Sequence, residues 1–364
     1  MIHGPSPKWL APRITVLILT VQVIAGCAVA VNEPVAEPFN TDVFGANRAA
    51  TAGVYVRVVD VGTALCIAGA TRSGWHFVYD AGGEGQACLR AVREIVGKNA
   101  IDLLIISHSD VEHMRDVPAL LREFEVRELW WTAYRRPQPS FRKTRRAIDD
   151  AAAGGTRVRS LRADGLSPGT VFELGEARVT LVAGGTLWTG NDELDDKLLA
   201  KSASLVVRVD YGETSLLLTG DTIGRLASWP DSECGFAEAE MARRQDTVSL
   251  DADVLVAPNH GANTASSACL IRAVNQTWVI FPSGHRNNEP QGAMVALYLG
   301  QGLSLHRLLR TDRGEEESAA EWDHLRSTDC RDQPGDDDIE ILMRQSKPPE
   351  VRYVQPKDIC IVLR

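Results

Sequence analysis

The sequence predicts a mixed α/β fold in which sheets and helices are stacked in layers. Runs rich in β-branched and aromatic residues recur, first with one helix between them and then as a meander. Strand and helix patterns alternate after that. Polar residues gather where the buried strands end, and this combination of elements favours a layered α/β architecture.

Composition limits the possible partners of the protein. The 364 residues are 44% hydrophobic and 24% charged, which is typical of a soluble protein with a sizeable core. The net charge of −9 repels nucleic acid over the molecule as a whole, so a polyanionic substrate needs a local basic patch. "YRRPQPSFRKTRR" (134–146) is one candidate, and a solvated helix face is its alternative interpretation.

The N-terminus has the pattern of an export signal. Lys8 and Arg13 precede a short apolar run that meets Cys27 in "IAGC", which resembles a bacterial lipobox. We therefore expect a lipoprotein signal peptide at 1–26, a lipid anchor at Cys27 and a tether at 27–50. The predicted location is the bacterial cell envelope, membrane-anchored on the periplasmic or outer surface. A plain secretory signal or an N-terminal anchor is the alternative.

Cysteine usage also favours an oxidising compartment. Six cysteines besides Cys27 allow up to three disulfides. They are Cys66, Cys88, Cys234, Cys269, Cys330 and Cys360. Cys330 and Cys360 are the preferred pair, and isolated buried thiols are the alternative for Cys66 and Cys269.

The first part of the chain after the tether has patterns that predict three strands and two helices. Segments 54–62 and 75–83 predict strands closed by glycines, and 85–97 has helical spacing that ends at a glycine. Segment 100–107 ("AIDLLIIS") is a continuous apolar run typical of a fully buried strand. Apolar residues at i, i+3, i+4 and i+7 in 116–126 predict a helix.

The middle of the chain returns to strands. "VRELWWT" (126–132) predicts a strand, and the polar segment 134–170 predicts a helix with loops. Two strand patterns follow within 171–183. Segment 202–221 predicts a hairpin that turns at "DYGET".

The last part predicts a charged helix and further buried strands. Strand patterns end in polar residues at 251–261 and 276–288. Beyond about residue 310 lie an acidic stretch and two short strand-like runs, "IEILMR" and "DICIVLR". We assign 311–364 to a C-terminal extension, which the preferred Cys330–Cys360 disulfide would hold.

Four metal-ligating side chains follow the strand at 100–107. They are His108, Asp110, Glu112 and His113. Alternation in an extended loop sends the first three to one side, and the next turn can bring the last alongside. Imidazole and carboxylate ligands suit zinc, manganese or iron. The alternative is a polar loop in which an aspartate caps a helix.

Other strand ends carry similar chemistry. Asp221 follows a glycine after an apolar strand, where a carboxylate can bridge two ions. His260 stands at another strand end. "FPSGHRNNEP" offers polar residues at a fourth: Ser283, His285, Arg286 and Asn287.

The ordered set resembles the metallo-β-lactamase superfamily, and more closely the extracellular domain of ComEC/Rec2-type competence proteins. The segments that carry it run in the family's order: "VVDVG", "VYDAGG", "SHSDVEHM", "SLVVRVDYGETSLLLTGD", "PNHGANTAS" and "PSGHRNNEP". The resemblance implies an αββα four-layer sandwich over 51–310.

The resemblance also implies a site with one or two divalent ions, zinc or manganese. Its ligands would be His108, Asp110, Glu112, His113, Asp221 and His260. Glu112 and Asp221 would be catalytic, and the polar residues at 283 and 285–287 would bind substrate. A metal-activated water would then attack the substrate.

Several positions depart from the family pattern. Asp110 stands where many members have histidine, Glu112 replaces the usual aspartate, and "HMRD" replaces "HIGG". Glu289, not a histidine, stands directly before Pro290, and no histidine occupies 171–200. The losses fall mainly on the half of the site formed by His108 and Asp110.

The resemblance implies an exported, membrane-tethered metal-dependent hydrolase. As its substrate class the resemblance favours phosphodiesters such as DNA or nucleotides. The alternative is a non-catalytic binding or structural lipoprotein on a degenerate scaffold of the same fold. DNA transport through a membrane is set aside, because no apolar run after residue 27 is long enough to span one.

Overall fold

The structure is a computed structural model that describes most of the chain from residue 52 onward. The described residues are 52–83, 85–136, 138–161, 164–185, 194–230, 232–284, 289–312 and 337–354, with residues 1, 4 and 48 and the backbone of 330–331 and 361–362. Residues 42–364 form one compact unit. Cys27 and nearly all of the predicted signal peptide and tether lie outside the described residues.

Eight strands form the first sheet, in the order β16-β15-β1-β2-β3-β4-β5-β6. Its antiparallel part runs from β16 to β3, and β3 to β6 are parallel. The bounds are β1 (Val54–Val58), β2 (Cys66–Thr71), β3 (His76–Ala81), β4 (Ile101–Ile106), β5 (Val126–Trp131), β6 (Arg157–Ser160), β15 (Ile339–Arg344) and β16 (Lys347–Tyr353).

Seven strands form the second sheet, in the order β13-β12-β11-β10-β9-β8-β7. β7 to β10 are an antiparallel meander, and β10 to β13 are parallel. The bounds are β7 (Val171–Leu174), β8 (Ala177–Ala183), β9 (Val206–Tyr211), β10 (Thr214–Leu218), β11 (Val254–Val256), β12 (Trp278–Phe281) and β13 (Leu308–Arg310). A separate short pair joins β14 (Cys330–Arg331) to β17 (Ile361–Val362).

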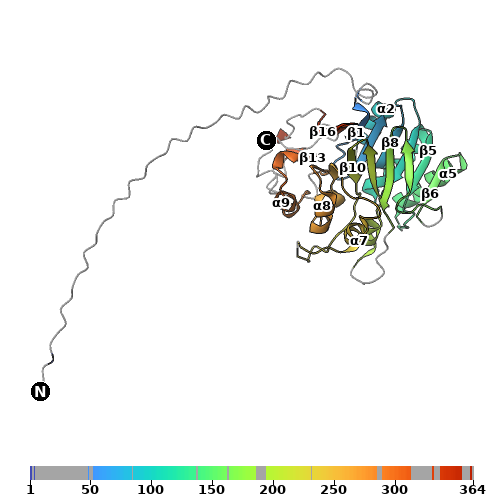
Figure 1. The fold of residues 1–364 in the computed structure, drawn as a ribbon. Coiled ribbons are helices and arrows are strands. Elements are labelled where there is room, and N and C mark those ends of the chain that lie inside the picture. Colours follow the sequence, from blue (N-terminus) through green and yellow to red (C-terminus); the bar gives the residue numbers. More distant parts are fainter. Residues whose placement is uncertain are drawn as a thin grey trace. The chain divides into compact units, whose positions relative to one another are not determined.

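Helices connect these strands and cover the sheets (Figure 1). On the first half of the chain they are α2 (Ala87–Val96), α3 (Val111–Met114), α4 (Val117–Glu123) and α5 (Pro139–Ala153). On the second half they are α6 (Asp196–Ser202), α7 (Phe236–Arg244), α8 (Ala268–Val274) and α9 (Gly292–Gly300), with short 3₁₀ turns at Pro258–Gly261 and Leu305–Arg307.

Three apolar layers establish the αββα sandwich predicted for the metallo-β-lactamase type. The central layer combines inward residues of both sheets, for example Val56 of β1 and Val207 of β9. A second layer packs α2, α4 and α5 on the outer face of the first sheet. A third packs α7, α8 and α9 on the outer face of the second sheet. The fold class is therefore confirmed.

Strand β4 shows why a continuous apolar run was needed at this point in the chain. Leu103 and Ile105 face the other sheet, whereas Leu104 and Ile106 face the helices. Both faces of the strand are buried, so strict alternation of polar and apolar residues is absent. The hairpin predicted at "DYGET" is also present, since β9 pairs with β10 through Tyr211 and Thr214.

The proposed boundary at residue 310 needs correction. β15 pairs directly with β1, and β16 pairs with β15, so 337–354 belongs to the sandwich rather than to a separate extension. The segment 134–170 also contains β6 in addition to the expected helix α5. β15 is paired with β1, which is distant in the sequence, and β6 is paired with β5.

The structure pairs four of the cysteines. Cys66–Cys88 joins β2 to α2, and Cys234–Cys269 joins the segment before α7 to the start of α8. The alternative of isolated thiols at Cys66 and Cys269 is therefore wrong. Cys360 lies outside the described residues, so its pairing with Cys330 stays a prediction.

Glu238 on α7 has a fully buried carboxyl group. It accepts hydrogen bonds from the backbone N–H groups of Ser266 and Ser267, at 2.9 and 2.7 Å. Burial raises the pKa of Glu238 to about 7, against the opposing effects of these hydrogen bonds and of Arg225. Its stabilising contribution is therefore complete below the unfolded pKa near 4.5 and is lost as pH rises through about 7.

We predict that this group lowers the free energy of unfolding by about 3 kcal/mol between pH 5 and pH 8. Denaturant titrations of the metal-free protein should show that decline. Glu238→Gln, which cannot ionise, should remove it, at a cost of ~1 kcal/mol for one lost acceptor. Glu240→Gln, on the same helix, should keep the wild-type slope; an unchanged slope in Glu238→Gln contradicts the assignment.

Candidate metal centre

Three strand ends and one short helix bring the predicted ligands together. His108 follows β4 by two residues, and Asp221 and His260 follow the neighbouring parallel strands β10 and β11. His113 lies on α3, which begins directly after Asp110. The site therefore lies where strands of both sheets end, as the sequence predicted for buried strands that run into polar residues.

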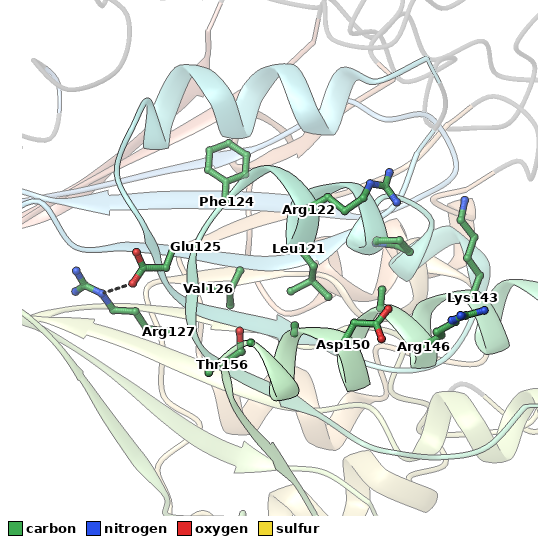
Figure 2. A pocket seen from close by; sticks show the side chains of 15 residues that line it. Leu121, Arg122, Phe124, Glu125, Val126, Arg127, Lys143, Arg146, Asp150 and Thr156 are labelled. Atoms are coloured by element: carbon green, nitrogen blue, oxygen red, sulfur yellow. Dashed lines mark ion pairs between the residues drawn. The ribbon is translucent and has the colours of Figure 1, made fainter.

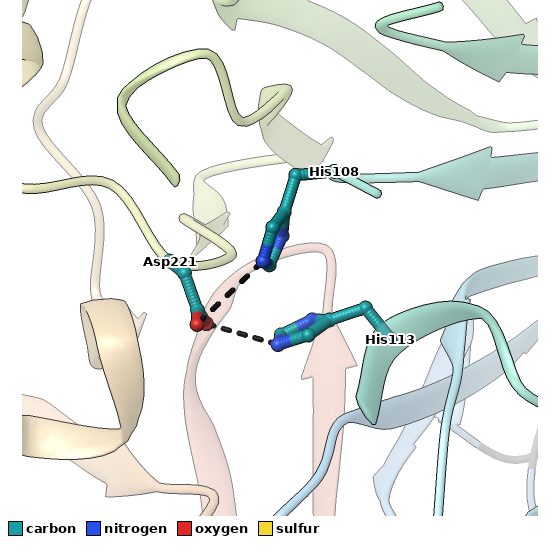
Figure 3. Close-up of side chains that lie close together, drawn as sticks. All are labelled: His108, His113 and Asp221. Atoms are coloured by element: carbon teal, nitrogen blue, oxygen red, sulfur yellow. Dashed lines mark ion pairs between the residues drawn. The ribbon is translucent and has the colours of Figure 1, made fainter. Parts of the chain in front are cut away.

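Asp221 is the centre of the cluster, and three imidazoles converge on it. Its Oδ1 lies 3.1 Å from Nε2 of His113 and 3.4 Å from Nε2 of His260. Its Oδ2 lies 3.7 Å from Nε2 of His108. Figure 3 shows the rings of His108 and His113 pointing at this carboxylate. All four side chains are buried.

The Nδ1 atom of each histidine is held from behind. His113 Nδ1 contacts Asp80 Oδ2 at 2.8 Å, and His260 Nδ1 contacts the Pro282 carbonyl oxygen at 2.6 Å. His108 Nδ1 contacts the Ser107 hydroxyl at 3.0 Å. Each of these Nδ1 atoms acts as a donor, so Nε2 is left as the metal-facing nitrogen.

Asp80 organises the loop that carries these ligands. One oxygen accepts from the Ser107 backbone N–H at 2.6 Å, and the other accepts from the Ser107 hydroxyl at 2.6 Å and from His113. Because that hydroxyl donates to Asp80, its lone pairs are free to accept from His108. Asp80 has a left-handed backbone with φ 58°, a conformation that costs energy outside glycine and is concentrated at functional sites.

Two further backbone features bring the segments close. Asn259 and His260 are both left-handed, with φ 48° and 57°, which turns the imidazole back toward Asp221. A Cβ atom on Gly82 would lie 1.5 Å from the carbonyl oxygen of Glu112. Glycine at position 82 is therefore required for α3 to approach β3 this closely.

Charges within the cluster shift its protonation. Burial raises the pKa of Asp221, but His113, Lys201, His260 and His108 outweigh burial and hold it well below its usual range. Burial lowers the pKa of His113, but Asp221 and Asp80 outweigh burial and raise it to about 10. The two carboxylates therefore favour the protonated form of His113, and a bound ion would replace its Nε2 proton.

The donor set fits a divalent ion. The buried atoms His108 Nε2, His113 Nε2 and Asp221 Oδ1 have no hydrogen-bond partner. One ligand atom from each of these three residues lies within 4.8 Å of the others. Buried polar atoms without a hydrogen-bond partner are costly, and coordination to a cation satisfies all three together. Imidazole with carboxylate suits zinc, manganese or iron.

Lys201 is a member of the centre that the sequence analysis missed. Its Nζ lies 2.5 Å from Asp221 Oδ2 and 2.5 Å from Asn259 Oδ1, and the side chain is almost completely buried. Burial lowers the pKa of Lys201, but Asp221 outweighs burial and raises it. Lys201 therefore carries an ammonium group beside the histidines.

Asp110 and Glu112 lie on the periphery of this arrangement. Asp110 Oδ2 is 3.7 Å from His108 Nε2, and Oδ1 is 3.5 Å from Nη2 of the buried Arg136. Burial raises the pKa of Asp110, but His108, Lys201 and Arg136 outweigh burial and lower it. Glu112 is half-buried on α3 and is close enough for its charge to raise the Lys201 pKa. Among the described residues neither joins the group of three closest ligands.

The fourth strand end is placed only in part. Ser283 is fully buried, and its hydroxyl donates to Asp312 and to the Phe281 carbonyl oxygen. This hydroxyl is already engaged by the protein, so the structure gives it a structural position rather than a substrate-facing one. The other predicted substrate-binding residues, His285, Arg286 and Asn287, lie outside the described residues.

The basic run 134–146 divides into two parts. On α5, Phe141, Thr144 and Ile148 are buried, and the cationic residues of the helix face solvent. This agrees with the alternative interpretation of the run as a solvated helix face. A cavity of about 710 Å³ lies beside α5 and is lined by Arg122, Lys143 and Arg146 among others (Figure 2). It includes none of the metal-centre residues. Arg136, before the helix, instead reaches Asp110.

Comparison with known proteins reveals no match to a protein family or to a curated protein. Several solved structures are similar in fold. The metallo-beta-lactamase fold protein YhfI from Bacillus subtilis has 10% identity and a TM-score of 0.42, covering 71% of this chain and 95% of its own. Zn(2+)-bound PqqB from Methylobacterium extorquens has 12% identity and a TM-score of 0.42, covering 71% and 98%.

The diiron β-hydroxylase CmlA from Streptomyces venezuelae has 13% identity and a TM-score of 0.42, covering 71% of this chain and 52% of its own. These likenesses are distant and assign no chemistry to this chain. The sandwich and the buried His/Asp group together define a layered αββα fold with a candidate metal site.

We predict that Asp80→Asn weakens divalent metal binding by about 10- to 100-fold, because the amide cannot both accept from Ser107 and hold His113 in its metal-binding orientation. Isothermal titration with zinc measures this. Asp102→Asn is the matched control, since Asp102 is also buried and accepts from a backbone N–H, that of His76, at the opposite end of β4. It should change stability but not affinity. Equal affinity in both variants would remove Asp80 from the site.

Proposed function

We propose that the protein is a metal-dependent hydrolase that uses a metal-activated water. The observation that carries the proposal is the convergence of three imidazole Nε2 atoms on one buried carboxylate, each imidazole held in place at Nδ1. Polar groups buried without partners are costly, so such a constellation is retained where it has a ligand. Zinc and manganese both suit these donors.

The protein's own residues have distinct tasks in this proposal. When bound, the ion would lower the pKa of its water and stabilise developing negative charge. Asp80 holds His113 in position, and Asp221 contributes the carboxylate ligand. Glu112, half-buried beside the cluster, is the candidate for orienting the attacking water.

We propose phosphodiesters, in DNA or nucleotides, as the substrate class. Support comes from the resemblance of the motif order to ComEC/Rec2-type competence proteins and from Arg136. This guanidinium is buried next to Asp110, and its Nη1 makes no hydrogen bond. A planar donor in that position suits a phosphate oxygen.

We propose an exported protein that is lipid-anchored at Cys27. Support comes from the signal-like N-terminus and from the two disulfides, which persist in oxidising compartments. No helix of the described residues is long and apolar enough to cross a membrane. Metabolic labelling with a palmitate analogue tests the anchor, and labelling that persists in Cys27→Ala contradicts it.

One observation favours the alternative of a non-catalytic binding lipoprotein. Lys201 already supplies a positive charge to Asp221, so the carboxylate is partly neutralised without a metal. If Lys201 and His113 were together sufficient, the centre would be a structural ion-pair network on a degenerate scaffold.

Metal content and turnover separate the two functions. We expect the purified protein, incubated with zinc or manganese, to retain bound metal and to hydrolyse bis(p-nitrophenyl) phosphate or single-stranded DNA. His113→Ala should reduce turnover by about 100-fold or more, since it removes a ligand. His306→Ala, at an exposed histidine, should match wild type.

Wild type without bound metal, and with no more turnover than His113→Ala, contradicts the hydrolase. That result would leave the non-catalytic lipoprotein as the function. Bound metal without phosphodiester cleavage would overturn the substrate class alone.

A further inference from the structure

The position of Lys201 divides the metal centre into two unequal sides. Lys201 is near the end of α6, and its ammonium bonds to Asp221 Oδ2 and to Asn259 Oδ1. Oδ2 is also the oxygen that faces His108. His113 and His260 face the other oxygen, Oδ1. One carboxylate thus presents one oxygen to a protein cation and the other to two imidazoles.

On the side that holds Lys201, the second carboxylate, that of Asp110, also has a cation beside it. Asp110 lies with His108 on this side, and Arg136 Nη2 approaches its Oδ1 to 3.5 Å. The charges of both Lys201 and Arg136 act on Asp110. The two carboxylates that a metal ion would need here are therefore each matched by a buried cation of the chain.

The Oδ1 side has no such cation from Lys or Arg among the described contacts. Its buried atoms, His113 Nε2 and Asp221 Oδ1, lie 3.1 Å apart but have no hydrogen bond of good geometry. His108 Nε2, which faces Oδ2, also has no hydrogen bond, and it belongs to the same group of ligand atoms within 4.8 Å of one another. Two divalent ions in hydrolase sites lie about 3.5–4 Å apart on a shared carboxylate. An ammonium on one oxygen of Asp221 would repel a second dication there.

We propose that the Lys201 ammonium permanently takes the place of one of two metal ions, so that the centre binds a single ion at His108, His113 and Asp221. His113 and His260 face Oδ1 of Asp221, and His108, which faces Oδ2, still reaches this ion because one ligand atom of each of the three residues lies within 4.8 Å of the others. The inference rests on the proposed function in one respect, that a metal ion binds at all. It extends that function by fixing the number of ions and by assigning Lys201 as a positioning residue for Asp221.

The arrangement has a consequence for the chemistry. A single ion with an adjacent ammonium keeps two positive centres beside the substrate but only one that can activate water. The ammonium stays at its position at any metal concentration, so occupancy of the centre requires one binding event instead of two.

The test measures metal stoichiometry. The full-length protein is titrated with manganese, and bound ions are counted by mass spectrometry after desalting and by calorimetry. Wild type should bind one ion per chain. Lys201→His, which exchanges the cation for a ligand, should bind two, and its electron paramagnetic resonance spectrum should show a spin-coupled pair that wild type lacks.

Two further variants make the result interpretable. Lys201→Met removes the charge with little change in volume and should reveal a second, weaker binding event. Lys197→His adds a histidine to an exposed position of the same helix and should still bind one ion. If Lys201→Met does not fold, wild type and Lys201→His decide the question.

Each outcome has a separate meaning. Two ions in wild type overturn the single-ion centre and leave metal-dependent hydrolysis intact. One ion in wild type and in both Lys201 variants shows that Lys201 does not limit the count, and overturns its role. No ion in wild type overturns the proposed function together with this inference.

Discussion

The carboxylate of Asp221 imposes the constraint on which the rest of the centre depends. It is fully buried at the end of an apolar strand, and an ionised carboxylate there is stable only if cations or donors surround it. The structure meets that need with three imidazoles and one ammonium, drawn from strand ends of both sheets, from α3 and from α6. The same convergence gives the site its metal-binding geometry, so the electrostatic requirement of folding and the chemistry of the site have one origin.

Local patterns predicted a layered α/β fold and candidate ligands at strand ends, whereas the four-layer sandwich came from the family resemblance. Apolar runs of strand length that end in His, Asp or Glu appear in the sequence at His108, Asp221 and His260, and the strands place these residues together. What local patterns could not reveal is the partner of a strand. "IEILMR" was recognised as strand-like, but its pairing with β1 depends on a segment near the other end of the chain.

The missed members of the site share a physical reason. Lys201 stands near the end of a short helix, where a lysine is usually solvated and favourable toward the helix dipole. It is buried only because Asp221 and Asn259 arrive from other elements. In the sequence Asp80 is simply a residue at the end of a predicted strand. Its role in holding Ser107 and His113 depends on a left-handed backbone conformation that residue spacing does not predict. The family pattern has a histidine ligand in the segment that corresponds to 171–200. Its absence in this sequence was the signal that a different residue occupies the side of the site where Lys201 lies.

The pairing of β15 with β1 governs when this protein can complete its fold. β1 is among the first strands to be synthesised and β15 is among the last, yet they are neighbours in one sheet. Until residue 344 has been made, the edge of β1 presents unpaired N–H and C=O groups that attract other chains. β15 and β16 can therefore join the first sheet only after most of the chain has been made. A chain truncated before residue 339 would carry an open edge at β1 that invites association with other chains.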